Sequence, residues 1–122
     1  MTEVLSATPK TLIVSDNVVE AEDLTEMLAE CGLGPIAHAR DVRGARDLFA
    51  STNGSLELMI FGLSLHKPDA KGFLETVASE RKPLVVIDGQ KDAAELNGAG
   101  ILLRPFSTND VMAALKHVGL SD

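Results

Sequence analysis

The chain has 122 residues, 45% of them hydrophobic and 24% charged, which is enough for one globular domain of ordinary composition. A net charge of −7 and only 3% aromatic residues argue against direct nucleic-acid binding, because phosphates are repelled overall and bases find few stacking partners. No apolar run approaches the roughly 20 residues that span a bilayer, the N-terminus lacks a signal-peptide pattern and the single cysteine cannot form an internal disulfide, so we expect a cytoplasmic protein without membrane contact.

The N-terminal half of the chain predicts three strands separated by two amphipathic helices. The run TLIV at 11–14 is continuously apolar, as expected of a strand covered on both faces, and strands are also predicted at 35–39 and 56–61. The segment 18–31 repeats apolar residues at helical spacing, and we expect these to face inward: Ala21, Leu24, Leu28 and Cys31. A second helix is predicted at 41–51, with the inward residues Val42, Ala45 and Leu48 or Phe49.

The C-terminal half continues the alternation of helix and strand. Helices are predicted at 71–80, at 90–100 as a short segment closed by glycines, and at 107–120, with strands at 84–87 and 101–103. We expect the inner helix faces to consist of Phe73, Leu74 and Val77, and of Val111, Leu115 and Val118. The last helix begins with the capping pattern Ser107-x-x-Asp110.

Strand and helix alternate five times, with short connections throughout. Parallel neighbours need crossover connections, so the alternation predicts an α/β fold of flavodoxin-like type, a doubly wound five-stranded parallel sheet. We expect a single domain over 1–122, with its core at about 11–120. In such sheets a site lies at the carboxyl ends of the strands, which here selects Ser15, Asp16, Gly62, Asp88 and Arg104.

Four short motifs follow the predicted strands in order: LIVSDN, GLSLHKPDAKGF, VVIDG and NGAGILLRPF. With these motifs the chain resembles the receiver domain of two-component response regulators, from Thr11 to about Leu120. The resemblance implies a CheY-like fold in which an aspartate at the end of the third strand accepts a phosphoryl group. It also implies two acids after the first strand that help to hold Mg²⁺, and a Thr or Ser and a Lys, after the fourth and fifth strands, that contact the phosphoryl group.

The acceptor position departs most from this pattern. GLSL resembles the Asp-Leu-Ser-Leu type of sequence in the family, which puts Gly62 at the acceptor position. If His66 and Lys67 are treated as an insertion and the alignment is shifted by two, Ser64 takes that place instead. Neither residue has a carboxylate, and an unactivated hydroxyl needs a base. We therefore expect a pseudo-receiver that lacks the phosphoacceptor aspartate and has no catalysis of its own.

The other site positions have changed as well. Of the acidic pair only Asp16 remains, after Ser15, while Asp88 replaces the hydroxyl residue and Arg104 the lysine. Because Arg104 competes for the acids, we expect no Mg²⁺ and no other cofactor or metal. Either Arg104 forms an ion pair with Asp88 or Asp16 that mimics or bypasses the contact made by phosphorylation, or Asp88 and Arg104 point to water. By the same resemblance, the bond from Arg104 to Pro105 is expected to be cis.

The resulting hypothesis is an atypical, phosphorylation-independent receiver domain that acts as a protein–protein interaction module in bacterial two-component signalling. Its partner would be a histidine kinase, a phosphotransfer protein or regulator of a phosphorelay, or an output domain outside this chain. The interval between 88 and 104 is too short for the usual fourth helix of the family, so its usual dimer is not assumed and a homodimer stays open. The alternative is a small-ligand sensor that binds an anion or nucleotide in the degenerate cleft or through Arg40, Arg43 and Arg46 on the second helix.

Three further features carry weaker functional signals. The acids of the first helix form either a docking surface for a basic partner or a solvated face. Cys31 is expected to be a small core residue at a helix end. The histidines His38, His66 and His117 have no pair at metal-ligand spacing, so zinc is not expected.

Overall fold

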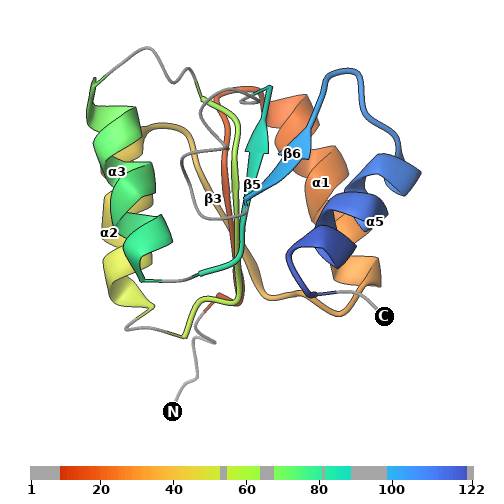
Figure 1. Ribbon diagram of the computed structural model, residues 1–122, viewed down its shortest axis with the longest axis horizontal. Coiled ribbons are helices and arrows are strands. Elements are labelled where there is room, and N and C mark those ends of the chain that lie inside the picture. Colours follow the sequence, from red (N-terminus) through yellow and green to blue (C-terminus); the bar gives the residue numbers. More distant parts are fainter. Residues whose placement is uncertain (1–8, 53–54, 64–67, 81, 89–98, 121–122) are drawn as a thin grey trace.

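The computed structural model describes residues 9–52, 55–63, 68–80, 82–88 and 99–120 (Figure 1). Its strands form one parallel five-stranded sheet in the order β3-β2-β4-β5-β6. They are β2 (Thr11–Val14), β3 (Ile36–Ala39), β4 (Leu58–Phe61), β5 (Leu84–Ile87) and β6 (Gly100–Leu102). The described helices are α1 (Val18–Glu30), α2 (Val42–Ser51), α3 (Pro68–Ser79) and α5 (Thr108–His117). The predicted flavodoxin-like, doubly wound α/β fold is confirmed.

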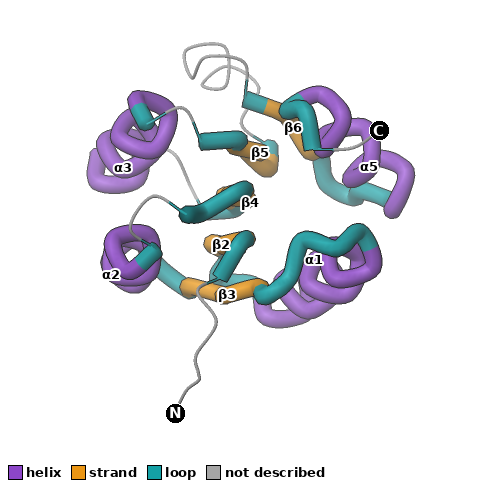
Figure 2. The backbone as a smooth tube through the Cα atoms, turned by 90° about the horizontal axis from the view of Figure 1, so that it is seen from below, coloured by secondary structure: helices purple, strands orange, loops and turns teal. Residues whose placement is uncertain are grey.

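The helices cover both faces of the sheet. Figure 2 shows α2 and α3 on one face and α1 and α5 on the other. Each face has its own core: Val14 and Phe61 belong to the core on one side, and Ile13 and Ile60 to the core on the other. Successive side chains of a strand point to opposite faces, which is why neighbouring residues contribute to different cores.

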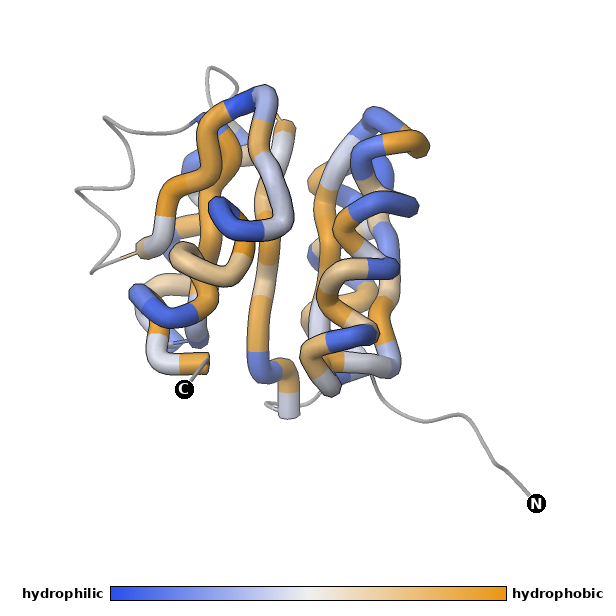
Figure 3. Tube along the Cα trace, turned by 90° about the vertical axis from the view of Figure 1, so that its right-hand side faces the viewer, coloured by the Kyte–Doolittle hydropathy of each residue, from blue (hydrophilic) through white to orange (hydrophobic). Residues whose placement is uncertain are grey.

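The three central strands are buried along their whole length, whereas the edges of the sheet are more exposed. All four residues of β2, β4 and β5 are buried, as expected of parallel strands with helices on both sides. On the edge strand β6, Ile101 remains 40% exposed. In Figure 3 the strands are mostly hydrophobic, whereas the helices alternate between hydrophobic and hydrophilic residues. No helix in the described part of the chain is long and apolar enough to cross a membrane.

The predicted boundaries of the elements are close to the observed ones. Strands at 11–14 and 84–87 match the prediction, and those predicted at 35–39, 56–61 and 101–103 begin one or two residues away from it. The short helix predicted at 90–100 falls, up to residue 98, outside the described residues, and Gly100 begins β6. The shortened fourth helix therefore stays a prediction.

The prediction that Cys31 lies in the core is wrong. Cys31 is the C-cap of α1, and its side chain is exposed. Gly32 then adopts a left-handed φ of 77°, and Leu33 turns back so that its N–H donates to the carbonyl of Leu28 (3.1 Å). Leu33 is thereby buried in the core, while Sγ of Cys31 lies 3.4 Å from Sδ of Met112 at the surface.

The start of α5 has the predicted capping box. Oγ of Ser107 accepts the backbone N–H of Asp110 (3.2 Å), and Oδ2 of Asp110 accepts the backbone N–H of Ser107 (2.8 Å). Val111 and Leu115 are buried as predicted. The capping box anchors the end of the loop between β6 and α5, which carries Arg104.

Candidate functional site

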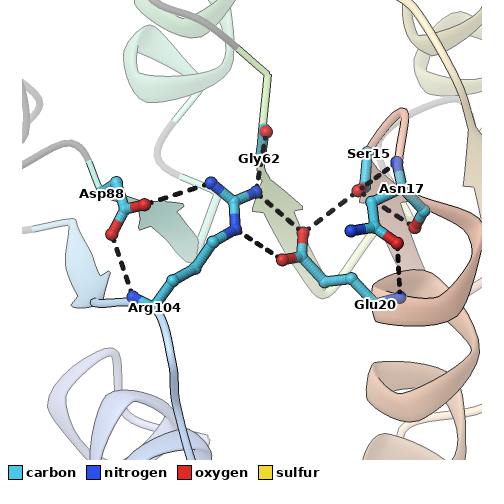
Figure 4. A network of polar contacts seen from close by, with 6 residues as sticks. All are labelled: Ser15, Asn17, Glu20, Gly62, Asp88 and Arg104. Atoms are coloured by element: carbon cyan, nitrogen blue, oxygen red, sulfur yellow. Dashed lines mark hydrogen bonds and ion pairs between the residues drawn. The ribbon is translucent and has the colours of Figure 1, made fainter.

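Four of the predicted site residues meet at the carboxyl edge of the sheet (Figure 4). Ser15, Gly62 and Asp88 each directly follow a strand, β2, β4 and β5 respectively. Arg104 lies two residues after β6. The parallel order of the strands places all four ends at the same edge, as in other doubly wound sheets.

The guanidinium of Arg104 is the centre of a network of polar contacts. Its Nε donates to Oε2 of Glu20 (2.6 Å), and its Nη2 donates to Oε1 of the same carboxylate (2.9 Å). Nη1 donates to Oδ2 of Asp88 (3.1 Å), and Nη2 also donates to the carbonyl oxygen of Gly62 (3.2 Å). The two parallel bonds to Glu20 have the bidentate geometry that suits a guanidinium and a carboxylate.

Asp88 is held by the same arginine at two points. In addition to the bond from Nη1, its Oδ1 accepts the backbone N–H of Arg104 (3.0 Å). Its own backbone is left-handed, with φ 57°, and its N–H donates to the carbonyl of Leu102 (2.7 Å), which ties the turn after β5 to β6. The predicted Arg104–Asp88 ion pair is therefore present, and the interpretation that both side chains point to water is wrong. The Arg104–Pro105 bond is cis, as expected.

Glu20 is the site residue that sequence reasoning missed. The sequence places it among the acids of a solvated helix, yet only 8% of its side chain is exposed. Its Oε1 accepts a further hydrogen bond from Oγ of Ser15 (3.1 Å). The other acids of α1 are exposed: Glu22, Asp23, Glu26 and Glu30. The signal that could have found Glu20 is the pattern Asn17-x-x-Glu20, an N-cap residue followed by a glutamate three positions later.

The start of α1 explains why Glu20 reaches the arginine. In a capping box, a glutamate at the third helical position accepts the backbone N–H of the N-cap residue. Here the N–H of Asn17 donates to Oγ of Ser15 instead (3.1 Å), while Oδ1 of Asn17 accepts the N–H of Glu20 (3.1 Å). The buried Ser15 thus takes the capping role of the glutamate, and the Glu20 carboxylate extends to Arg104.

Gly62 leaves the space that this network occupies. A Cβ built on Gly62 would lie 3.1 Å from Cδ1 of Ile87, 3.2 Å from Oε1 of Glu20 and 3.3 Å from Nη2 of Arg104. These distances are shorter than ordinary van der Waals contacts. The backbone of Gly62 is not left-handed, since the positive φ values of the described glycines belong to Gly32 and Gly119. A side chain at this position would therefore press on its neighbours by a few tenths of an ångström, whereas the backbone conformation would accept one.

Asp16 lies apart from the network. It is exposed and borders an open depression of about 190 Å³ between the first β–α loop and helices α2 and α3. The depression is lined by Asp16, Arg40, Asp41, Val42, Leu63, Asp69 and Ala70. The alternative pairing of Arg104 with Asp16 is therefore wrong. Within the described ranges, no three His, Cys, Asp or Glu side chains form a group that could hold a metal ion.

The three arginines near the second helix do not share one helix face. Arg40 precedes α2, whose N-cap is Asp41. Arg46 lies over the ring of Phe73, 5.4 Å from its centroid, and its Nη2 donates to the backbone carbonyl of Asp69 (3.5 Å). The prediction of a shared helical surface of Arg40, Arg43 and Arg46 is wrong, because Arg40 lies outside the helix and Arg46 packs against α3.

The surroundings of Arg104 stabilise its charged form. Its hydrogen bonds to Glu20 raise its pKa above the ordinary value for arginine, partial burial opposes this effect, and Asp88 adds to it. Because the folded-state pKa is above the unfolded one, the contribution to stability is complete below the unfolded pKa and is lost only as pH rises through the folded pKa. Both values lie far above neutral pH, so Arg104 stays charged under all ordinary conditions.

Comparisons with solved structures identify the fold. The chain matches chemotaxis protein CheY4 of Vibrio cholerae with a TM-score of 0.70 and 18% identity over 92% of this chain and 99% of that one. It matches a two-component response regulator from Clostridium difficile with a TM-score of 0.73 and 20% identity, over 90% and 94% of the two chains. The signal receiver domain of an HD domain-containing protein from Pseudomonas fluorescens gives a TM-score of 0.69 and 20% identity, over 96% of this chain and 90% of that one. No sequence-family model and no curated protein matches the chain. The likeness shows that this chain has the receiver-domain fold.

The receiver fold implies a Mg²⁺ ion at this edge of the sheet, and the residues present do not fit one. Three oxygen-bearing groups converge here, the carboxylates of Glu20 and Asp88 and the carbonyl of Gly62, and each already accepts a hydrogen bond from Arg104. A metal ion at the same place would lie against a guanidinium that does not lose its proton. Asp16, the remaining acid of the predicted pair, is outside the network.

Proposed function

We propose that this receiver-fold chain is a pseudo-receiver: a protein–protein interaction module of bacterial two-component signalling that acts in the cytoplasm, without phosphorylation and without catalysis of its own. The observation that carries the proposal is the contact between Gly62 and the Glu20–Arg104 ion pair. At the position where the resemblance expects the acceptor aspartate there is no carboxylate. The space into which a side chain would project is bordered by the ion pair.

Phosphoryl transfer lacks its other requirements as well. A carboxylate nucleophile needs a divalent ion to neutralise the transferring oxygens, and the oxygens that would hold it are bonded to Arg104. Ser64, the alternative acceptor, lies outside the described residues, and a serine needs a base to become a nucleophile. His38, on β3, has its Nε2 2.7 Å from the carbonyl oxygen of Ser15.

The network supports a single fixed conformation of this edge. Arg104 joins the loop before α5 to the start of α1, to the end of β4 and to the turn after β5. In the family, a phosphoryl group would make contacts at this place, whereas here an arginine makes them permanently. A domain of this kind signals by binding a partner: a histidine kinase, a phosphotransfer protein, a regulator or an output domain outside this chain.

The exposed acids of α1 form a surface that suits a basic partner. Four carboxylates remain exposed on this helix after Glu20 is removed from the set: Glu22, Asp23, Glu26 and Glu30. A solvated face would show the same pattern, so the acids support the interaction role without identifying the partner. The alternative function, anion or nucleotide sensing, gains no support, because Arg40 shares its depression with the carboxylates of Asp16, Asp41 and Asp69.

Incubation with a small phosphoryl donor tests this function. We expect the intact mass of the protein to be unchanged after treatment with acetyl phosphate and Mg²⁺, because Gly62 has no nucleophile. A receiver domain with its acceptor aspartate, treated in parallel, controls for the activity of the donor. A phosphoryl group on this chain would contradict the proposal, and its stability would then distinguish a labile acyl phosphate from a stable ester on Ser64.

The same samples test the interaction role. Treated and untreated protein are titrated by calorimetry with purified histidine kinases and phosphotransfer proteins from the same genome. We expect one of these proteins to bind, with the same affinity for both samples. Binding that requires the donor would contradict independence from phosphorylation, and no binding to any of them would contradict the interaction role.

A further inference from the structure

We propose that the guanidinium of Arg104 is a built-in cation that takes the place of a divalent metal ion, and that its removal converts this edge of the sheet into a Mg²⁺ site. The inference deepens the proposed function, since it explains how the edge stays closed without a metal or a phosphoryl group. It is carried by the oxygen atoms that surround the guanidinium, which are drawn in Figure 4.

Three oxygen-bearing groups from three different elements converge on the guanidinium. Glu20 comes from α1, Gly62 follows β4 and Asp88 follows β5. Two carboxylates and one backbone carbonyl are the donor types that Mg²⁺ and Ca²⁺ prefer, and Mg²⁺ completes its shell with water when a protein offers only one or two carboxylates. The donor set is therefore that of a hard cation, although a nitrogen cation occupies it.

The burial of Glu20 shows that this set requires a positive charge. With 8% of its side chain exposed, the carboxylate is almost removed from water. A charge in such a place needs an opposite charge and hydrogen bonds, and Glu20 receives two bonds from Arg104 and one from Ser15. Without Arg104, the carboxylates of Glu20 and Asp88 would have no cation between them.

Arg104 also explains why the wild-type protein would not bind a metal ion at this edge. Its backbone N–H is fixed to Asp88 and its side chain to Glu20, so it is held at both ends. A metal ion could enter only by displacing four hydrogen bonds of the guanidinium while lying close to its positive charge. A neutral residue at position 104 would remove both obstacles and leave the oxygen donors to bind the ion directly after a small shift or through its bound waters.

Thermal unfolding in the presence of divalent ions tests the inference. Wild type, Arg104→Gln, and the double variant Arg104→Gln with Glu20→Gln are heated with MgCl₂ up to about 10 mM, which is above the dissociation constants of weak divalent sites. KCl at the same ionic strength controls for screening. We expect Mg²⁺ to raise the Tm of Arg104→Gln by about 5 °C and to leave wild type and the double variant unchanged.

Arg43→Gln is the matched control variant. Arg43 is exposed on α2, outside the network, so this change removes the same charge without opening the site. We expect no specific effect of Mg²⁺ on its Tm. Amide NMR spectra of Arg104→Gln should show Mg²⁺-dependent shifts centred on Ser15, Gly62 and Asp88, which a purely structural role of the arginine would not produce.

Two results would overturn the inference. The first is Mg²⁺ binding by the wild type, seen as a rise in Tm or as amide shifts at the site. The second is a folded Arg104→Gln protein that does not respond to Mg²⁺. If Arg104→Gln is unfolded in the absence of divalent ions, recovery of the folded state on addition of Mg²⁺ supports the inference, and failure to recover it contradicts it. These outcomes are distinct from the phosphoryl-donor test, since a wild-type Mg²⁺ site would still lack an acceptor at Gly62.

Discussion

At Gly62 the missing side chain is matched by the atoms around it. Ile87, Glu20 and Arg104 approach the position of the absent Cβ to within 3.1–3.3 Å. The absence of a side chain at Gly62 and the ion pair beside it are therefore two aspects of one arrangement. A side chain at this position would require its neighbours to shift by a few tenths of an ångström.

The variant Gly62→Ala adds one methyl group and tests whether the site has room for a side chain at this position. We expect it to lower the free energy of unfolding by about 1–3 kcal/mol, because the methyl overpacks a site whose neighbours are bonded to each other. The measurement is urea denaturation followed by circular dichroism, with the midpoint as readout.

Gly72→Ala is the matched control for Gly62→Ala. A Cβ on Gly72 meets no atom within 4 Å, and this glycine lies inside α3. We expect it to raise stability by about 0.5–1 kcal/mol, since alanine favours the helix. If both variants had the same stability, the account of Gly62 as a space requirement would be wrong.

The residues of the site could be predicted only in part. Asp88 and Arg104 are predictable because each lies just after the carboxyl end of a strand, where doubly wound sheets place their sites. Glu20 is not predictable in the same way, because its side chain leaves the solvated face of α1 and nothing in the helical period indicates that direction. Its partner is 84 residues away in the sequence, so the pairing depends on the tertiary structure.

Among the elements, α1 has the start that matters most for the site. Asn17 caps the helix, and Oγ of Ser15 accepts a hydrogen bond from the backbone N–H of Asn17. The carboxylate of Glu20 is therefore not needed for capping and extends to Arg104. A capping box at α5, formed by Ser107 and Asp110, shows the ordinary arrangement in the same protein. The two helix starts differ in their N-cap and third residues and in the serine that precedes α1.

Ser15→Ala is expected to destabilise the protein by about 1–3 kcal/mol, because the N–H of Asn17 and the buried Glu20 each lose a partner. Ser51→Ala is the control: this exposed serine donates to the carbonyl of Leu48 in its own helix, and we expect a change within about 0.5 kcal/mol. Urea midpoints measure both effects. Equal midpoints for the two variants would mean that Ser15 does not hold the network.

Most of the helices and strands are predictable, because the spacing of the apolar residues and the residue composition of each segment indicate the same structure. Central strands with continuous apolar runs, such as 11–14 and 84–87, were located without error, since both faces are covered. At the end of α1 the helical period alone predicts that Cys31 faces inward, whereas Gly32 turns the chain and Leu33 enters the core. Helical spacing does not hold past Gly32, because this glycine ends the helix.

For the whole molecule, the order of the strands makes the long-range pair possible. In the sheet, β6 is separated from β2 by β4 and β5, and α1 and α5 cover the same face. The side chain of Arg104 extends from the end of β6 past Gly62 to Glu20 (Figure 4). The alternation of strands and helices was enough to predict the topology, but the partner of Arg104 depends on side-chain directions that the topology does not specify.

The proposed role of Arg104 depends on one hydrogen bond, which its Nε donates to the carboxylate of Glu20 in the free protein. The most direct measurement is the exchange rate of the Arg104 Nε–H with water, observed by nitrogen-15 NMR. We expect this hydrogen to exchange at least about tenfold more slowly than that of the exposed Arg43, and to lose its protection in Glu20→Gln, because a hydrogen bond between charged groups contributes about 1.5–3 kcal/mol. Equal exchange rates for Arg104 and Arg43 in the wild type would contradict the account.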